Sequence, residues 1–141
     1  MKILVAVDGS KSSLKAVKYA AKLAVGLRTK DRITLISVHD DHALRHAKQF
    51  VGKSEIADYL RAVSDEDLDT ARKHLAKSGV AYDAIIKQGH VAEEIIRTAN
   101  SGKFDMVVVG SKGRSGIVDM LLGSVTQKIV TAAKPPVVVV K

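Results

Sequence analysis

The stretch DMVVVGSKGRSGIVDMLLGSV, residues 105–125, passes from an apolar segment through a glycine-rich loop into a helical pattern. Its apolar part, 107–109, shows no alternation of polar and apolar residues, and neither does 137–140 near the end of the chain. Strands that are covered on both faces have this composition, and they belong to parallel sheets wrapped by helices. The stretch therefore predicts an α/β fold in which a buried strand leads through a glycine-rich turn to a helix.

Outward from this stretch, apolar runs and amphipathic patterns alternate along the whole chain. The runs 2–7, 33–38, 81–87, 105–109 and 136–140 are predicted strands. Helical periodicity is present over 14–24, 56–75, 92–99 and 125–133. This alternation predicts a three-layer α/β sandwich with right-handed crossovers, formed as a single domain over residues 1–141.

Capping signals mark the ends of the predicted helices. Ser10 is the expected N-cap of the first helix and Gly26 the residue that follows its end. The second helix should end at Gly79, and Ser64 with Asp67 would fit a fresh helix start that allows a kink. The polar connection 39–53 is expected to be a loop with a helical turn near 43–50.

Charge and composition limit the classes of partner that this chain is expected to bind. Lys and Arg outnumber Asp and Glu by 23 to 15, giving a formal charge of +8, which suits anionic ligands. The cations are scattered, however, and the five aromatic residues do not alternate with basic ones as a platform for nucleic acid would require. Nucleic acid is therefore not the expected main partner. The chain contains no cysteine, no signal-peptide pattern and no membrane-length apolar segment, and we expect a cytoplasmic protein.

The glycine-rich loop predicts a phosphate site. Glycine lets backbone amides approach an anion closely and can adopt the positive φ that turns successive N–H groups toward one point. Gly110, Gly113 and Gly116 supply such a loop, and Gly123 with Ser124 precedes a helix whose first amides favour negative charge. Taken singly, each glycine is explained by a turn and Ser124 by helix capping. Their joint spacing is not.

Two common phosphate motifs are absent. The loop contains neither G-x-x-x-x-G-K-[ST] nor G-x-G-x-x-G. The pattern present is G-x2-G-x9-G-[ST], from Gly110 to Ser124, and it resembles the ATP-binding signature of the universal stress protein family. The resemblance extends over the whole chain, through the opening KILVAVDGS, Gly89 after the third strand, LLGSVTQKIV and the terminal PPVVVVK.

The resemblance implies a Rossmann-like fold of the adenine nucleotide alpha hydrolase type, with a five-stranded parallel sheet of order 3-2-1-4-5 and ATP at the ends of strands one and four. Asp8, with Val7 and Ser10 beside it, would meet the ribose or adenine, and the backbone of Val38 would face the adenine edge. Contacts to ribose and phosphates would come from Gly110, Ser111, Lys112, Gly113, Arg114, Gly123, Ser124, Val125 and Thr126. On this basis a valine at position 123 is expected to occupy the space of the phosphates.

Two positions depart from the family's usual pattern. Lys112 stands where members often have histidine, and a lysine is electrostatically favourable beside a polyphosphate. His90 and Val91 follow Gly89 where many members have an acidic residue and proline, which alters a loop near the phosphates.

Other chemistry is weakly indicated. His39, His42 and His46, with Asp40 and Asp41, are the one metal-like cluster, but they fall in the polar connection, and no metal site of the protein's own is predicted. Mg²⁺ is expected to arrive with ATP, held mainly by phosphates. The serines lack a G-x-S-x-G context, and no catalytic residue is predicted.

The sequence thus predicts an ATP-binding stress-response or signalling module with slow or no hydrolysis. A weak Mg²⁺-dependent ATPase or phosphotransferase and a nucleotide-free scaffold remain as alternatives. We expect a homodimer formed through the final strand, because an apolar strand at a sheet edge needs covering.

Overall fold

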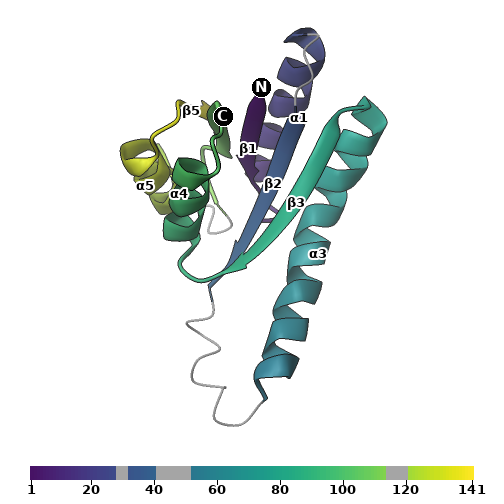
Figure 1. Ribbon diagram of the computed structural model, residues 1–141, viewed down its shortest axis with the longest axis vertical. Helices are drawn as coiled ribbons and strands as arrows, with labels where there is room; N and C mark the ends of the chain where they lie inside the picture. Colours follow the sequence, from purple (N-terminus) through teal and green to yellow (C-terminus); the bar gives the residue numbers. More distant parts are fainter. Residues whose placement is uncertain (28–31, 41–51, 114–120) are drawn as a thin grey trace.

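The structure is a computed structural model that describes residues 1–27, 32–40, 52–113 and 121–141. Strands and helices alternate along it (Figure 1). The strands are β1 (Lys2–Ala6), β2 (Arg32–His39), β3 (Ala81–Gln88), β4 (Met106–Gly110) and β5 (Val137–Val140). The helices are α1 (Lys11–Leu27), α3 (Lys53–Ser78), α4 (Val91–Ser101) and α5 (Ser124–Ala132). The predicted strands and helices are confirmed, while the turn expected at 43–50 lies outside the described residues.

All five strands form one parallel sheet in the order β3-β2-β1-β4-β5. This confirms the expected order 3-2-1-4-5. The chain winds from β1 outward to β3, then returns to the other side of β1 as β4 and continues to β5. The winding direction therefore reverses between β1 and β4, and a crevice is expected beyond the carboxyl ends of these two strands.

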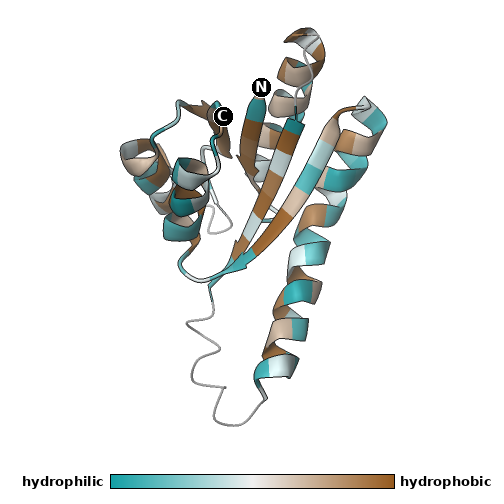
Figure 2. Ribbon diagram, viewed as in Figure 1, coloured by the Kyte–Doolittle hydropathy of each residue, from teal (hydrophilic) through white to brown (hydrophobic). Residues whose placement is uncertain are grey.

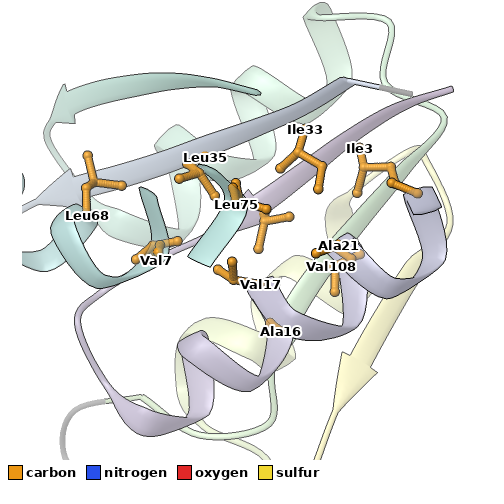
Figure 3. Packing of buried hydrophobic residues seen from close by; sticks show 14 residues of the cluster. Ile3, Val7, Ala16, Val17, Ala21, Ile33, Leu35, Leu68, Leu75 and Val108 are labelled. Atoms are coloured by element: carbon orange, nitrogen blue, oxygen red, sulfur yellow. The ribbon is translucent and has the colours of Figure 1, made fainter. Parts of the chain in front are cut away.

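Helices cover both faces of the sheet. α1 and α3 pack on one face and α4 and α5 on the other, which gives the predicted three layers (Figure 1). Successive side chains of a strand point to opposite faces, so β1 contributes to two cores. Ile3 and Val5 join Val17 of α1 and Leu75 of α3 in the larger core, whereas Leu4 belongs to the core beneath α4 and α5 (Figure 3).

Capping fixes the start of α1 and the end of α3. The backbone N–H of Ser13 donates to Ser10 Oγ at 3.1 Å, which confirms Ser10 as the N-cap of α1. α3 ends at Gly79, whose φ of 68° is left-handed and therefore suits glycine. Both boundaries are set by local chemistry that the sequence already shows.

Two expectations about the helices are wrong. Gly26 lies inside α1 and does not end it, since its side is open to solvent and a single glycine costs only helix propensity there. α3 runs without a break through Ser64 and Asp67, because Leu60 and Leu68 on either side of them stay buried against the sheet. None of the helices in the described ranges is long and apolar enough to cross a membrane.

β5 forms one edge of the sheet. Its four valines are half-buried, two packing toward the core under α1 and α3 and two toward the core under α4 and α5. Figure 2 shows this strand as uniformly hydrophobic. Within the described part of the chain, β5 pairs only with β4, so its outer edge has no strand beside it.

Candidate functional site

A cleft of about 460 Å³ opens at the carboxyl ends of β1, β2 and β4. It lies where the winding direction of the sheet reverses, as the sequence predicts. Its volume is in the range of sites for small molecules and cofactors. Ten of the predicted site residues line it: Val7, Asp8, Val38, Gly110, Lys112, Gly113, Gly123, Ser124, Val125 and Thr126.

The remaining three predicted residues are placed differently. Ser10 lies behind the cleft as the N-cap of α1. Ser111 is buried and fixed through its backbone, with its N–H donating to Val140 O at 2.9 Å. Arg114 lies outside the described residues. Ser10 and Ser111 are not among the described residues that line the cleft, and their contact with a ligand stays a prediction.

Hydrogen bonds within the protein hold the glycine-rich connection against the start of α5. The N–H of Gly123 donates to Ser111 O at 2.8 Å, and the buried hydroxyl of Thr126 donates to Gly110 O at 2.8 Å. Both donors are thus used by the protein itself, and their contact with a ligand stays a prediction. The backbone N–H of Lys112 is likewise held by Ser12 Oγ at 3.2 Å.

Gly110 is required because α1 approaches the end of β4. A Cβ at this position would lie 2.7 Å from the backbone carbonyl of Ser12, closer than real Cβ contacts. None of Gly110, Gly113 and Gly123 has a positive φ, so close approach explains the first of them better than the turn geometry that we expected. A Cβ on Gly113 would lie 3.6 Å from Asp8 Oδ2, so the loop passes directly beside this carboxylate.

Gly123 lines the cleft, but a side chain added at this position would point toward the loop. A Cβ there would meet the backbone N of Gly113 at 3.3 Å. A valine at 123 would contact the loop at 112–113, and the expectation that it fills the space of the phosphates stays a prediction. Such a variant tests loop packing and ligand binding together.

The start of α5 has backbone donors without intrahelical acceptors, on residues that line the cleft. Gly123 is the N-cap, and the N–H of Gln127 makes the first intrahelical bond, to Gly123 O at 3.0 Å. The amides of residues 124–126 consequently have no intrahelical acceptor. Ser124 and Val125 line the cleft, and no acidic side chain in the first turn offsets the helix dipole. This end of the cleft favours an anion.

Asp8 is held in place by the turn between β1 and α1. Gly9 has a φ of 79°, and the N–H of Ser10 then donates to Asp8 Oδ1 at 2.9 Å. Ser13 Oγ accepts the backbone N–H of Asp8 at 3.4 Å. The carboxylate therefore stands at the mouth of β1, between the ends of β2 and β4.

The sequence analysis missed one wall of the cleft. His39 at the end of β2 and Asp67 of α3 both line it, and their side chains are only 12% and 10% exposed. His39 Nε2 lies 3.7 Å from Asp67 Oδ2 and 3.2 Å from Ser37 Oγ. The sequence signal that could have identified Asp67 is its place in α3, directly beside the buried and mostly apolar side of this amphipathic helix.

The opposite wall is apolar. It is formed by β2, β4 and the helices above them, through Ile36, Val38, Val91, Ile95, Val109 and Ile129. A planar aromatic ring system fits such a wall, since ring faces are apolar while ring edges carry the hydrogen-bonding groups.

The metal-like cluster is not assembled by the described residues. His42, His46 and Asp41 lie outside them, and no group of three or more His, Asp or Glu side chains that would hold a metal ion occurs in the described ranges. His39 and Asp40 instead line the cleft.

The fold agrees with that of known proteins. The family model described as "Universal stress protein family" matches residues 1–141. Universal stress protein YxiE of Bacillus subtilis is 31% identical over 147 residues, covering 99% of this chain and 98% of the relative. The solved structure of protein MJ0577 of Methanocaldococcus jannaschii has a TM-score of 0.86 and 26% identity over 99% of this chain and 94% of that one.

A second solved structure contains a ligand. It is a universal stress protein in complex with cAMP, with a TM-score of 0.67 and 25% identity, covering 99% of this chain and 95% of its own. The family match over the whole sequence, the sheet order and these likenesses agree. This chain belongs to the universal stress protein family.

Proposed function

We propose that this protein binds ATP, together with Mg²⁺, in the cleft between β1 and β4, and that it acts as a nucleotide-dependent module in a stress or signalling response with slow or no hydrolysis. The observation that carries the proposal is the start of α5, where Ser124 and Val125 line the cleft and have amides without an intrahelical acceptor, beside a loop that passes close to Asp8. Unpaired amides at a helix N-terminus bind phosphate.

The polarity of the cleft gives the nucleotide a direction. Lys112 is the only lysine or arginine among the described residues that line it, and it lies at the β4 end beside the α5 amides. Asp40 and Asp67 line the part of the cleft near the end of β2. Phosphates therefore belong at the β4 end and the base at the β2 end, with the ribose over Asp8.

The distance between the strand ends supports placing the nucleotide across β1. Neighbouring strands are about 4.8 Å apart, so the ends of β2 and β4, which flank β1, are separated by roughly 10 Å. A nucleotide laid across β1 would reach both ends. The universal stress protein solved with cAMP supports an adenine nucleotide as the kind of ligand that this fold accepts.

Mg²⁺ would be held chiefly by the nucleotide. The described residues form no three-ligand cluster of their own, although Asp8 and Asp40 line the cleft and carry the oxygen ligands that Mg²⁺ prefers. Mg²⁺ would neutralise phosphate charge. What the protein adds is position: amides for the phosphates and an apolar wall for the base.

Replacing Ser124 with proline tests the phosphate site directly. Ser124 is the first helical residue, where proline is tolerated, and Gly123 before it has φ −65° and ψ 155°, which suits a following proline. Ser124→Pro thus removes one amide donor while α5 remains. We expect the Kd for ATP with Mg²⁺, measured by calorimetric titration, to rise at least about tenfold, the effect of losing one hydrogen bond to a charged group.

Ser124→Ala is the matched control. It removes the hydroxyl but keeps the N–H, and we expect a change of less than about threefold in Kd. Equal affinity of the wild type and Ser124→Pro would refute the assignment of the phosphates to α5. Mass spectrometry of nucleotide released from the purified protein identifies what occupies the cleft, and steady Mg²⁺-dependent phosphate release would favour the alternative of a weak ATPase.

We also propose a homodimer that pairs through β5. The supporting observation is the open edge of this strand, whose valines are only half-buried within the chain. A second copy of the strand would cover them and satisfy the backbone groups at the edge.

A further inference from the structure

Asp67 is a carboxylate at a place where packing alone would favour an apolar side chain. The buried residues of α3 are Ile56, Leu60, Ser64, Leu68, Ala71 and Leu75, and Asp67 adjoins them with a side chain that is only 10% exposed. Withdrawing a carboxylate from water is unfavourable unless partners compensate. Asp67 also lines the cleft, so its carboxylate lies where a ligand can reach it.

The carboxylate is positioned by the end of β2. Asp67 Oδ2 lies 3.7 Å from His39 Nε2, and the same ring nitrogen lies 3.2 Å from Ser37 Oγ. Ser37 is buried and His39 nearly so, which limits the movement of the group. Asp67 thus lines the cleft at the β2 end, about two strand spacings, or roughly 10 Å, from the proposed phosphate-binding end.

An ionised carboxylate discriminates between the edges of purine bases. It only accepts hydrogen bonds, so it favours an amino group at the base and repels a carbonyl oxygen at the same position. Asp8 and Asp40 line the same cleft, and Lys112, the only lysine or arginine among its described lining residues, is at the other end. A carbonyl group at the β2 end would therefore meet the acceptor groups of Asp40 and Asp67.

We propose that Asp67 is a specificity residue that selects a 6-amino purine over a 6-oxo purine, by accepting a hydrogen bond from the amino group. The inference rests on the proposed nucleotide function and adds a contact from α3, an element that the glycine-rich signature does not include. The backbone of Val38 and the carboxylate of Asp67 would then read the base from two elements.

The test exchanges the acceptor for a group that can also donate. ATP and inosine triphosphate differ at position 6 of the base, which is amino in one and oxo in the other, and at N1, which carries a hydrogen only in the 6-oxo base. We expect the wild type to bind ATP at least about tenfold more tightly, by calorimetric titration. In Asp67→Asn the amide can donate to the oxo group, so ATP should weaken, inosine triphosphate should strengthen, and the ratio of their Kd values should fall at least about tenfold.

Asp69→Asn is the matched control. It makes the same change of charge two residues further along α3, on a 56% exposed side chain that pairs with Lys73, and it should leave the ratio unchanged. A ratio in Asp67→Asn within twofold of the wild-type ratio, with ATP still bound, would overturn the inference and leave the proposed function standing.

Two further outcomes are decisive. A wild type that binds neither nucleotide refutes the proposed function and the inference together. If Asp67→Asn does not fold, the wild type is titrated with the triphosphate of purine riboside, which lacks any group at position 6. Binding as tight as that of ATP would contradict the amino-group contact, and a loss of at least about tenfold would support it.

Discussion

Two buried serines on the helices differ in how their hydroxyl groups are satisfied. Ser13 Oγ donates to Ser10 O at 3.0 Å and accepts the N–H of Asp8. Ser64 is completely buried on α3, and its Oγ has no hydrogen-bond partner in the described part of the chain. A buried hydroxyl without a partner loses its hydrogen bonds to water and gains none in return. The two sites should therefore respond in opposite ways to the same substitution.

Ser64→Ala should raise the free energy of unfolding by about 1 kcal/mol, because it removes an unsatisfied group and improves helix propensity. Ser13→Ala should lower it by about 1 kcal/mol, since it leaves the N–H of Asp8 and the carbonyl of Ser10 without that partner. Urea unfolding of the two variants beside the wild type measures both. A loss of stability in Ser64→Ala would show that its hydroxyl has a partner.

At the scale of elements, the start of β2 is joined to β3 by an exposed ion pair. Arg32 Nε and Nη2 donate to the two carboxylate oxygens of Asp83 at 2.5 and 2.7 Å. The hydrogen bonds from Arg32 lower the pKa of Asp83 below its ordinary value of 3.8, against a smaller opposing effect of desolvation. The pair spans neighbouring strands of one sheet, so it supports their register.

The lowered pKa predicts a pH dependence of stability. A carboxyl whose pKa is depressed in the folded state stabilises the protein above its unfolded pKa, and this contribution is lost as pH falls through the folded value. The Tm of the wild type should exceed that of Asp83→Asn by a small margin near neutral pH, since exposed pairs contribute little. The margin should shrink toward zero below about pH 3.8. Thermal unfolding from pH 2.5 to 7 checks this, and a margin independent of pH would contradict it.

The connection from β4 to α5 is held at both of its ends by hydrogen bonds within the protein. Its two ends are tied together by the Gly123 and Thr126 hydrogen bonds and to β5 by the N–H of Ser111. The amides at the start of α5 are therefore positioned by the protein's own contacts. A site arranged in this way loses less conformational freedom when a ligand binds.

For the whole molecule, the open edge of β5 determines where a second copy could pair. The N–H of Val107 donates to Pro136 O and that of Ser111 to Val140 O, so the even-numbered residues of β5 face β4. The N–H of Val139 accordingly points to the open edge. A proline at this position removes an outward donor and spares the bonds to β4.

Val139→Pro should therefore weaken the proposed dimer. Two symmetry-related hydrogen bonds of about 1 kcal/mol each would be lost, and the dimer dissociation constant should rise at least about tenfold. Sedimentation equilibrium measures it, with Val139→Thr as the control that keeps the N–H and the branched shape. An unchanged dissociation constant in the folded proline variant would place the interface elsewhere, and a monomeric wild type would refute the homodimer.

The sequence by itself determined the alternation of elements, the parallel sheet and the place where a glycine-rich connection meets a helix start. These features depend on local order along the chain: apolar runs, the Ser10 cap, and glycines followed by a helix start. Tertiary structure alone decided which hydrogen-bonding groups are used within the protein. It used the Gly123 amide and the Thr126 hydroxyl within the protein, and it brought Asp67 of α3 to His39 of β2. Such pairings depend on how helices cross the sheet, because residues distant in the chain become neighbours only when the two cores pack.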